Sequence, residues 1–377
     1  MRTTKFDDIR PYFDEEIPDA LRRITESDAF PMISKYAFPK KSVDEVRDIL
    51  LSIKGADEFQ QRIMQYVIRE ILRKSSTEFT WNGLEKLERG KSYLFVSNHR
   101  DIMLDAAVLQ VILVENGMKG SEITFGANLM QGQLIIDIGK SNKMFRVERP
   151  GVGIDSARQF YLSSCHLSEY IRYAITEKKE SVWIAQRNGR TKDGNDTTDQ
   201  GVVKMFGMSY PEDKVEALDS LHIVPLAISY EWEPCDIMKV LELYETSKRA
   251  YIKKPGEDLN SILQGITAQK GRVHLEFCDP IRREELLQFD YLTGNRYNKE
   301  VASLLDDRIR HAYKLFPTNY IAHDIRYGHN TYSDKYTPKE KEAFLKRMGQ
   351  LVKYEEYDIE TMKDIFLGIY SNPVDNK

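Results

Sequence analysis

The strongest chemical signal in the chain lies between Ser97 and Asp105, which reads Ser-Asn-His-Arg-Asp-Ile-Met-Leu-Asp. This segment contains one imidazole, His99, and two nearby carboxylates, Asp101 and Asp105. An imidazole titrates near neutral pH, and a carboxylate bonded to it fixes its tautomer and stabilises the imidazolium that forms on proton transfer. The segment therefore predicts a general base that can take a proton from a hydroxyl group.

Two elements must position His99, one before it and one after it. The apolar run 93–96 is typical of a buried strand. The segment 101–116 is rich in Ala, Val, Leu and Ile and ends at Asn116-Gly117, which predicts a helix and its stop. The junction between a strand and the following helix is where open α/β sheets bind ligands.

The same alternation of short strands and helices continues along the middle of the chain. Further strands are predicted at 123–125, 144–147, 182–185, 223–229 and 273–277, with a long helix at 156–178. The pattern indicates an α/β fold with a mostly parallel central sheet flanked by helices.

Both ends of the chain carry apolar residues at helical spacing among many charges. We therefore expect an N-terminal helical segment at 1–75, a catalytic domain at 76–285 and a C-terminal helical extension at 286–377. The C-terminal part holds His311, His323 and His329 at no recognised metal-ligand spacing, so no metal site is expected there.

The composition argues against a nucleic-acid-binding protein, a disulfide-rich protein and a membrane-spanning protein. The 377 residues carry a net charge of −4 with a pI near 6.1, which is not typical of a nucleic-acid binder. Three scattered cysteines favour a reduced, cytoplasmic setting over a disulfide framework. The N-terminus shows no apolar signal core, and the apolar stretch 106–114 is about half of the roughly 20 residues that a spanning helix needs. We expect any contact with a membrane to be peripheral.

Four blocks of the sequence share their order and approximate spacing with a known pattern. They are Asn98–Asp105, Gly139–Arg149, Trp183–Gly194 and Ile223–Glu231. Over roughly residues 79–280 the chain resembles the glycerolipid acyltransferase superfamily, which includes glycerol-3-phosphate and lysophosphatidate (1-acylglycerol-3-phosphate) acyltransferases.

The resemblance implies an O-acyltransferase of phospholipid biosynthesis. His99 would activate the hydroxyl of a glycerophosphate-type acceptor, lysophosphatidate or glycerol-3-phosphate, for attack on a thioester. Acyl-CoA or acyl-ACP (acyl carrier protein) would be the co-substrate, with no further cofactor. The absence of a G-x-S-x-G motif argues against an ordinary hydrolase. Since the product belongs in a membrane, we expect peripheral attachment to its inner, cytoplasmic face.

The resemblance also assigns residues to the acceptor's phosphate and glycerol. The assignment falls on Arg149 of the second block and on Asn188, Gly189, Arg190 and Lys192 of the third. The planar guanidinium of arginine suits a phosphate because it donates two parallel hydrogen bonds.

Other basic side chains are less clearly assigned. Arg187 and Lys204 add positive charge nearby, although Arg187 could equally point to solvent. The basic residues 187–192 could also form a solvated loop.

The sequence departs from the superfamily pattern at two positions. The pattern places an aspartate five residues after the histidine, where this chain has Leu104. We favour Asp105 as the partner of His99, because Asp101 is better placed to cap the following helix. The pattern also has a glutamate where this chain has Asn188, which bears no charge.

Two other functions stay open. His99, Asp101 and Asp105 could instead hold a divalent metal in a phosphoesterase, or the chain could be a non-catalytic lipid-binding module of the same fold. The apolar residues at 126–130 and 134–136 could line a groove for an acyl chain, but core packing is the favoured interpretation.

Overall fold

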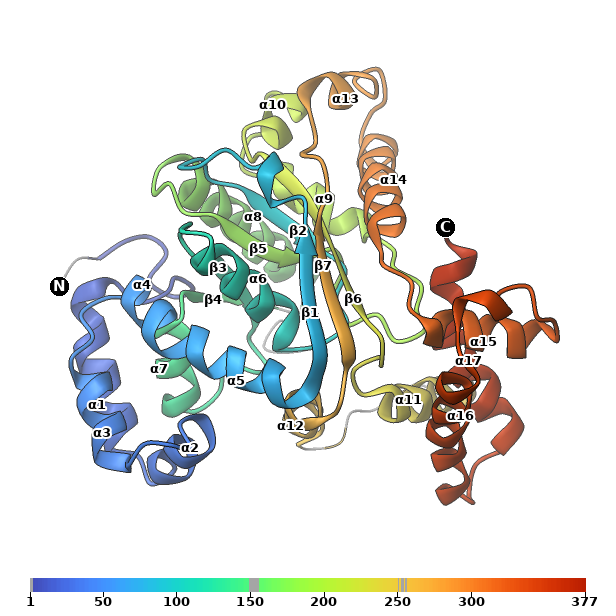
Figure 1. The fold of residues 1–377 in the computed structure, drawn as a ribbon. Helices are drawn as coiled ribbons and strands as arrows, with labels where there is room; N and C mark the ends of the chain where they lie inside the picture. Colours follow the sequence, from blue (N-terminus) through green and yellow to red (C-terminus); the bar gives the residue numbers. More distant parts are fainter. Residues whose placement is uncertain (1–2, 149–155, 250, 252–253, 255) are drawn as a thin grey trace.

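The computed structural model describes residues 3–148, 156–249, 251, 254 and 256–377. Its centre is a sheet whose strands run in the order β1-β7-β6-β2-β5-β3-β4 (Figure 1). The strands are β1 (Ser76–Asn82), β2 (Leu94–Ser97), β3 (Glu122–Gly126), β4 (Met144–Val147), β5 (Val182–Ala185), β6 (Ile223–Tyr230) and β7 (Gly271–Phe277).

Every neighbouring pair of strands is parallel except β6 and β7. Strand β2 lies between β5 and β6, with Ser97 opposite Ala185 on one side and Leu226 on the other. The carboxyl ends of β2, β3, β4 and β5 therefore meet at one edge of the sheet. The loops that follow these strands carry the candidate site residues to that edge.

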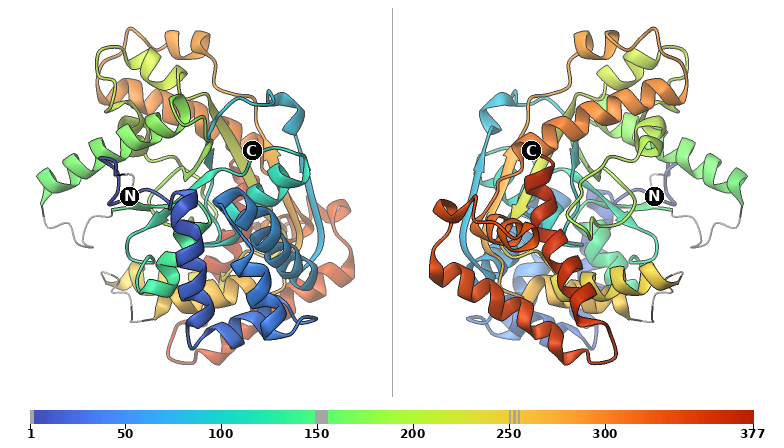
Figure 2. Two further views of the ribbon diagram at one scale, coloured as in Figure 1. Left: turned by 90° about the vertical axis from the view of Figure 1, so that its left-hand side faces the viewer. Right: turned by 90° about the vertical axis from the view of Figure 1, so that its right-hand side faces the viewer.

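Helices cover both faces of the sheet (Figures 1 and 2). Phe95 packs on the face covered by α5 (Gln65–Ser75) and α6 (Leu104–Glu115). Leu94 and Val96 pack on the opposite face, under α8 (Ala157–Thr176), α9 (Gln200–Gly207) and α14 (Asn295–Ala312). A strand that is buried on both faces has apolar side chains at every position, which explains why residues 93–96 are all apolar. Burying each such large side chain contributes roughly 1.5–3 kcal/mol.

The N-terminal helices form a core of their own beside the sheet. They are α1 (Ile17–Glu26), α2 (Phe30–Ala37), α3 (Val43–Leu51) and α4 (Ala56–Phe59), and a π-helical turn at Gln60–Met64 joins α4 to α5. This core packs on α7 (Gln133–Ser141) through Leu134 and Ile138. Arg23 is ion-paired with the buried Asp137 at 2.7 Å across the same contact. Leu134 therefore packs against the N-terminal helices, as the core interpretation expected, whereas Ile135 is 43% exposed and does not fit that interpretation.

The C-terminal helices α15 (Pro317–Tyr327), α16 (Pro338–Met348) and α17 (Ile359–Asp375) form another core with α11 (Asp236–Lys248). The remaining helices are α10 (Lys214–Asp219), α12 (Glu257–Thr267) and α13 (Arg283–Leu287). Figures 1 and 2 place α15 and α17 on the opposite side of the molecule from α8.

The predicted α/β class is confirmed, and all six predicted strands are present. Strand β1, an edge strand that pairs only with β7, was not among the predicted strands. Its sequence, Ser-Thr-Glu-Phe-Thr-Trp-Asn, has just two large apolar residues, because an edge strand needs less apolar surface than a central one. The proposed division into three segments stays a prediction.

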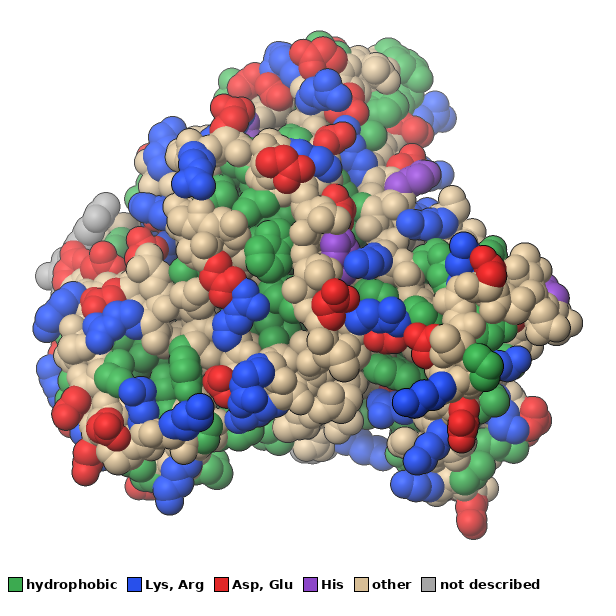
Figure 3. Space-filling view, in the orientation of Figure 1, with side chains coloured by type: hydrophobic (Ala, Val, Ile, Leu, Met, Phe, Trp, Pro, Cys, Tyr) green, Lys and Arg blue, Asp and Glu red, His purple; other side chains and the backbone are tan. Residues whose placement is uncertain are grey.

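The distribution of charged side chains on the surface is consistent with the small net charge of the chain. Acidic and basic side chains are interspersed over the face of the molecule drawn in Figure 3. Within the described part of the chain, no helix is both long enough and apolar enough to cross a membrane.

Candidate active site

His99 lies in the loop that joins β2 to α6, at the carboxyl edge of the sheet. Its side chain is 10% exposed, and it lines a cavity of about 610 Å³. The Nδ1 atom is 2.8 Å from Asp105 Oδ2, and the Trp183 ring stands edge-on at 5.8 Å between ring centres. Since Asp105 occupies Nδ1, Nε2 is the nitrogen available to a substrate.

The Asp105 carboxylate is buried and tightly held. Besides His99, Oδ2 accepts hydrogen bonds from the backbone N–H groups of Arg100 (2.5 Å) and Asp101 (2.9 Å). Oδ1 accepts one from the Tyr230 hydroxyl at 2.8 Å. Burial and the charge of Asp105 raise the pKa of Tyr230 well above its ordinary value, so this hydroxyl remains a donor. A carboxylate with this many donors stays in place and keeps the proton of His99 on Nδ1.

Asp101 makes different contacts. Its Oδ1 accepts hydrogen bonds from Met103 N (2.9 Å) and Leu104 N (2.8 Å), and so caps the start of α6. Its Oδ2 is buried against Gly265 of α12 and has no hydrogen-bond partner among the described residues. Burial and the neighbouring Asp105 raise the pKa of Asp101. The structure thus pairs His99 with Asp105 and uses Asp101 to begin the helix.

Asn98 fastens the His99 loop to the sheet. Its Nδ2 donates to the backbone oxygen of Ile228 (3.0 Å) and to Asp196 (3.0 Å), and its Oδ1 accepts from Ile228 N (2.8 Å). On the other side, Thr191 N donates to the His99 oxygen at 2.7 Å. The third sequence block is therefore bonded directly to the backbone of the proposed base.

Arg100 belongs to the support of the site rather than to its cavity. It is fully buried and ion-paired with Asp196 (2.6 Å) and Glu233 (3.2 Å). Lys239 adds a hydrogen bond to the Arg100 carbonyl oxygen (2.9 Å) and an ion pair with Glu233 (2.6 Å). Because these buried charges are paired with one another, they fix the loop next to His99.

The cavity at His99 has a largely apolar wall that the sequence analysis did not identify. Apolar side chains come from β3, α8, α9 and the residue that follows α9: Phe125, Phe160, Tyr161, Leu167, Val202, Met205 and Met208. The signal that could have revealed it is the apolar run Phe160-Tyr161-Leu162 at the start of α8, where the side chains are 40%, 56% and 56% exposed. Of the predicted groove residues, Gly126 lines this cavity, whereas Met130 is part of the core.

Polar side chains also line the same cavity. Arg187, Asn188 and Lys204 line it together with His99. Among the residues that the structure describes, neither Arg187 nor Lys204 forms an ion pair. Both cations therefore line the same cavity as His99, where they can contact an anionic ligand.

The acidic residues of the cavity wall already have partners. Glu148 is ion-paired with Arg146 at 2.6 Å. Asp199 accepts a hydrogen bond from Gly201 N at 2.8 Å and so caps α9. Their charges therefore offset the two cations only in part.

The structure does not bring Arg190 and Lys192 into the His99 cavity. Arg190 lines a separate cavity of about 490 Å³ between α11 and α12, where it donates to Ser261 Oγ at 3.2 Å. Lys192 is ion-paired with Glu242 of α11. Gly189, with a φ of +75°, adopts a backbone conformation that favours glycine and turns the chain between Asn188 and Arg190.

This turn is the physical reason why neighbouring residues of the third block face different cavities. Arg149, which the resemblance assigns to the phosphate, lies outside the described residues.

Comparison with known proteins adds a distant likeness of fold. No family model matches the chain, and no curated protein matches it in sequence. Among solved structures, the chain is similar to the 1-acyl-sn-glycerophosphate (LPA) acyltransferase PlsC from Thermotoga maritima, at 10% sequence identity and a TM-score of 0.36. The match covers 77% of this chain and 94% of that one. A likeness at this level concerns the fold, so the activity has to be inferred from the site itself.

Proposed function

We propose that the protein is an acyltransferase that moves a fatty acyl group from a thioester to a hydroxyl group. The observation that carries the proposal is the His99–Asp105 pair, whose imidazole borders an apolar cavity of about 610 Å³. A positioned base next to an apolar cavity suits a reaction in which one substrate carries a long hydrocarbon chain.

In the proposed reaction, His99 Nε2 takes the proton of the acceptor hydroxyl while its oxygen attacks the thioester carbonyl carbon. The new C–O ester bond forms, the C–S bond breaks, and the imidazolium returns the proton to the departing thiolate. Asp105 stabilises the imidazolium through Nδ1. A general base of this kind contributes roughly 10²–10⁴-fold to the rate.

The acceptor we propose is a glycerophosphate, either lysophosphatidate or glycerol-3-phosphate, and the donor is acyl-ACP or acyl-CoA. The support for an anionic acceptor is that Arg187 and Lys204 line the same cavity as His99. A phosphate between them would gain charge-assisted hydrogen bonds, which are about twice as strong as neutral ones.

We also propose that the protein works at the surface of a membrane, on its inner face. The support is the exposed apolar group Phe160, Tyr161 and Leu162 at the start of α8, beside the cavity. Apolar side chains of this kind insert into the boundary between lipid headgroups and acyl chains. A lipid substrate could then enter the cavity without passing through water.

The metal-dependent phosphoesterase fits the geometry less well. Both Asp105 oxygens accept hydrogen bonds, and Asp101 is used at the start of α6 and against α12. Of these three residues, only His99 lines the cavity. The carboxylates would have to leave four donors and a helix cap to coordinate a metal ion.

The decisive experiment is a transfer assay with purified protein. A labelled acyl donor, as acyl-CoA and as acyl-ACP, is offered with glycerol-3-phosphate, lysophosphatidate, other lysophospholipids and lyso-aminolipids. We expect an ester product with a glycerophosphate that persists in a chelator. Saturable lipid binding without product would identify a lipid-binding module instead, and activity lost in the chelator would favour the phosphoesterase.

A further inference from the structure

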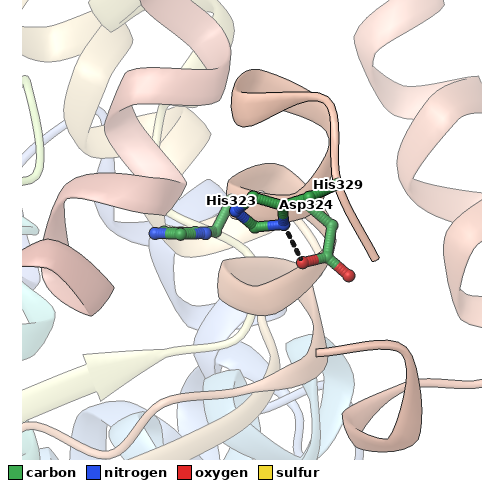
Figure 4. Close-up of side chains that lie close together, drawn as sticks. All are labelled: His323, Asp324 and His329. Atoms are coloured by element: carbon green, nitrogen blue, oxygen red, sulfur yellow. Dashed lines mark hydrogen bonds and ion pairs between the residues drawn. The ribbon is translucent and has the colours of Figure 1, made fainter. Parts of the chain in front are cut away.

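Three side chains at the end of α15 lie together outside the site described above. They are His323, Asp324 and His329 (Figure 4). One ring nitrogen of each histidine and one carboxylate oxygen lie within 4.8 Å of one another. Among the residues that the structure describes, this is the one group of histidine, cysteine and acidic side chains close enough to hold a metal ion.

The turn after α15 creates this group. The helix ends at Tyr327, and Gly328, with a φ of +68°, reverses the chain. His329 N donates to the Asp324 carbonyl oxygen at 3.0 Å, and His329 Nδ1 lies 3.0 Å from Asp324 Oδ1. Figure 4 shows the His329 ring facing the Asp324 carboxylate.

The Asp324 carboxylate is buried and already oriented. It accepts hydrogen bonds from Tyr332 N (3.2 Å) and from the Tyr336 hydroxyl (2.9 Å). These donors leave the carboxylate directed at His329. The fixed orientation lowers the entropy cost of placing it in a coordination sphere.

His323 has one anchored nitrogen and one free nitrogen. Its Nε2 lies 3.0 Å from Asp375 Oδ1, at the end of α17. Its Nδ1 is buried and finds no hydrogen-bond partner within the described part of the chain. A buried polar atom without a partner destabilises the folded state, and a bound ligand would supply the missing contact.

We propose that His323, Asp324 and His329 bind a divalent transition-metal ion such as Zn²⁺. Two imidazoles and one carboxylate suit this class of ion, with water completing a tetrahedral site. Ligand atoms of such a site lie about 3.3 Å apart, given metal–ligand distances of about 2.0–2.2 Å. The three ligand atoms now lie within 4.8 Å of one another, so binding would draw them closer together.

Asp375 supplies the remaining feature of a histidine metal site. A ligating imidazole almost always donates its other N–H to a carboxylate or carbonyl, which fixes the ring and raises its basicity. With Nδ1 on the ion, the Nε2–H of His323 would donate to Asp375. The ion would then tie the end of α15 to the end of α17, far from the His99 cavity, so the inference is independent of acyl transfer.

The test uses the full-length protein, stripped with a chelator and titrated with Zn²⁺ by calorimetry. We expect one equivalent to bind, and binding at least tenfold weaker in His323→Ala and in His329→Ala. Asp375→Asn should weaken it by roughly 10–100-fold, as loss of such a carboxylate does. The matched control is His311→Ala, which removes an exposed histidine bonded to the Asp307 backbone and should bind as the wild type does.

A second measurement uses only the wild-type protein, so it tests the proposal even if the variants fail to fold. Zn²⁺ should protect His323 and His329, but not His311, from diethylpyrocarbonate, as read by mass spectrometry. The absence of saturable Zn²⁺ binding, the absence of protection, or unchanged binding in a folded variant lacking both histidines would each overturn the proposal.

Discussion

The Tyr230 hydroxyl donates a 2.8 Å hydrogen bond to Asp105 Oδ1, so the last residue of β6 holds the carboxylate that binds His99. This contact joins residues 125 positions apart in the chain. We expect Tyr230→Phe to leave a buried carboxylate oxygen short of a donor and to cost about 1–3 kcal/mol in unfolding free energy. Urea unfolding measures the cost. A shift in the pH profile of kcat/KM would distinguish an effect on His99 from a loss of stability alone.

His99→Ala should lower acyl transfer by roughly 10²–10⁴-fold, because it removes the proposed base. The side chain borders the cavity, so the fold should persist, as circular dichroism can check. His166→Ala, at a half-buried histidine paired with Asp8, is the matched control and should keep full activity. A loss below about tenfold in folded His99→Ala would contradict the assignment.

The two aspartates of the His99 segment should respond differently. Asp105→Asn should cut turnover by about 10²-fold or more, since the amide cannot stabilise the imidazolium as a carboxylate does. Asp101→Asn should mainly weaken the start of α6, by about 1 kcal/mol or less of unfolding free energy. Steady-state kinetics and urea unfolding of both variants give the comparison. The reverse order of the two effects on turnover would make Asp101 the functional partner.

The cations of the His99 cavity should govern binding of the acceptor. Arg187→Ala and Lys204→Ala should each raise the KM of a phosphate-bearing acceptor by about tenfold or more, through loss of a charge-assisted contact. Arg190→Ala is the comparison, because Arg190 lines the separate cavity between α11 and α12. A larger rise in the acceptor's KM for Arg190→Ala would indicate that the phosphate binds in that cavity instead.

Lys270 should make stability depend on pH. Burial lowers its pKa from 10.5 to about 8 in the folded protein. Between these values the unfolded chain binds more protons than the folded one, so this residue makes stability rise with pH from about 8 to 10.5. Lys270→Met removes the contribution. The difference in unfolding free energy between the two proteins should therefore change over that range, as urea unfolding at several pH values would show, and a constant difference would contradict the prediction.

The sequence by itself determined the central strands and the nature of the proposed base. Central strands such as β2 and β5 are buried on both faces, so their sequences are continuous apolar runs. Such runs can be recognised without knowledge of the rest of the chain. The parallel arrangement then follows from the helices between them, and it brings the ends of these strands to one edge. His99 and its two nearby carboxylates were visible because they lie within seven residues of one another.

Only the tertiary structure decided which side chains meet. The expected capping role of Asp101 already favoured Asp105, but the contacts that hold Asp105 come from Tyr230 of β6 and from the backbone before α6, which no local pattern contains. The positive φ of Gly189 separates Asn188 from Arg190. The apolar wall from α8 and α9, and the His323–Asp375 contact, join segments distant in sequence. Contacts of this kind depend on how whole helices and strands pack against one another. The types and spacing of residues within one segment do not specify that packing.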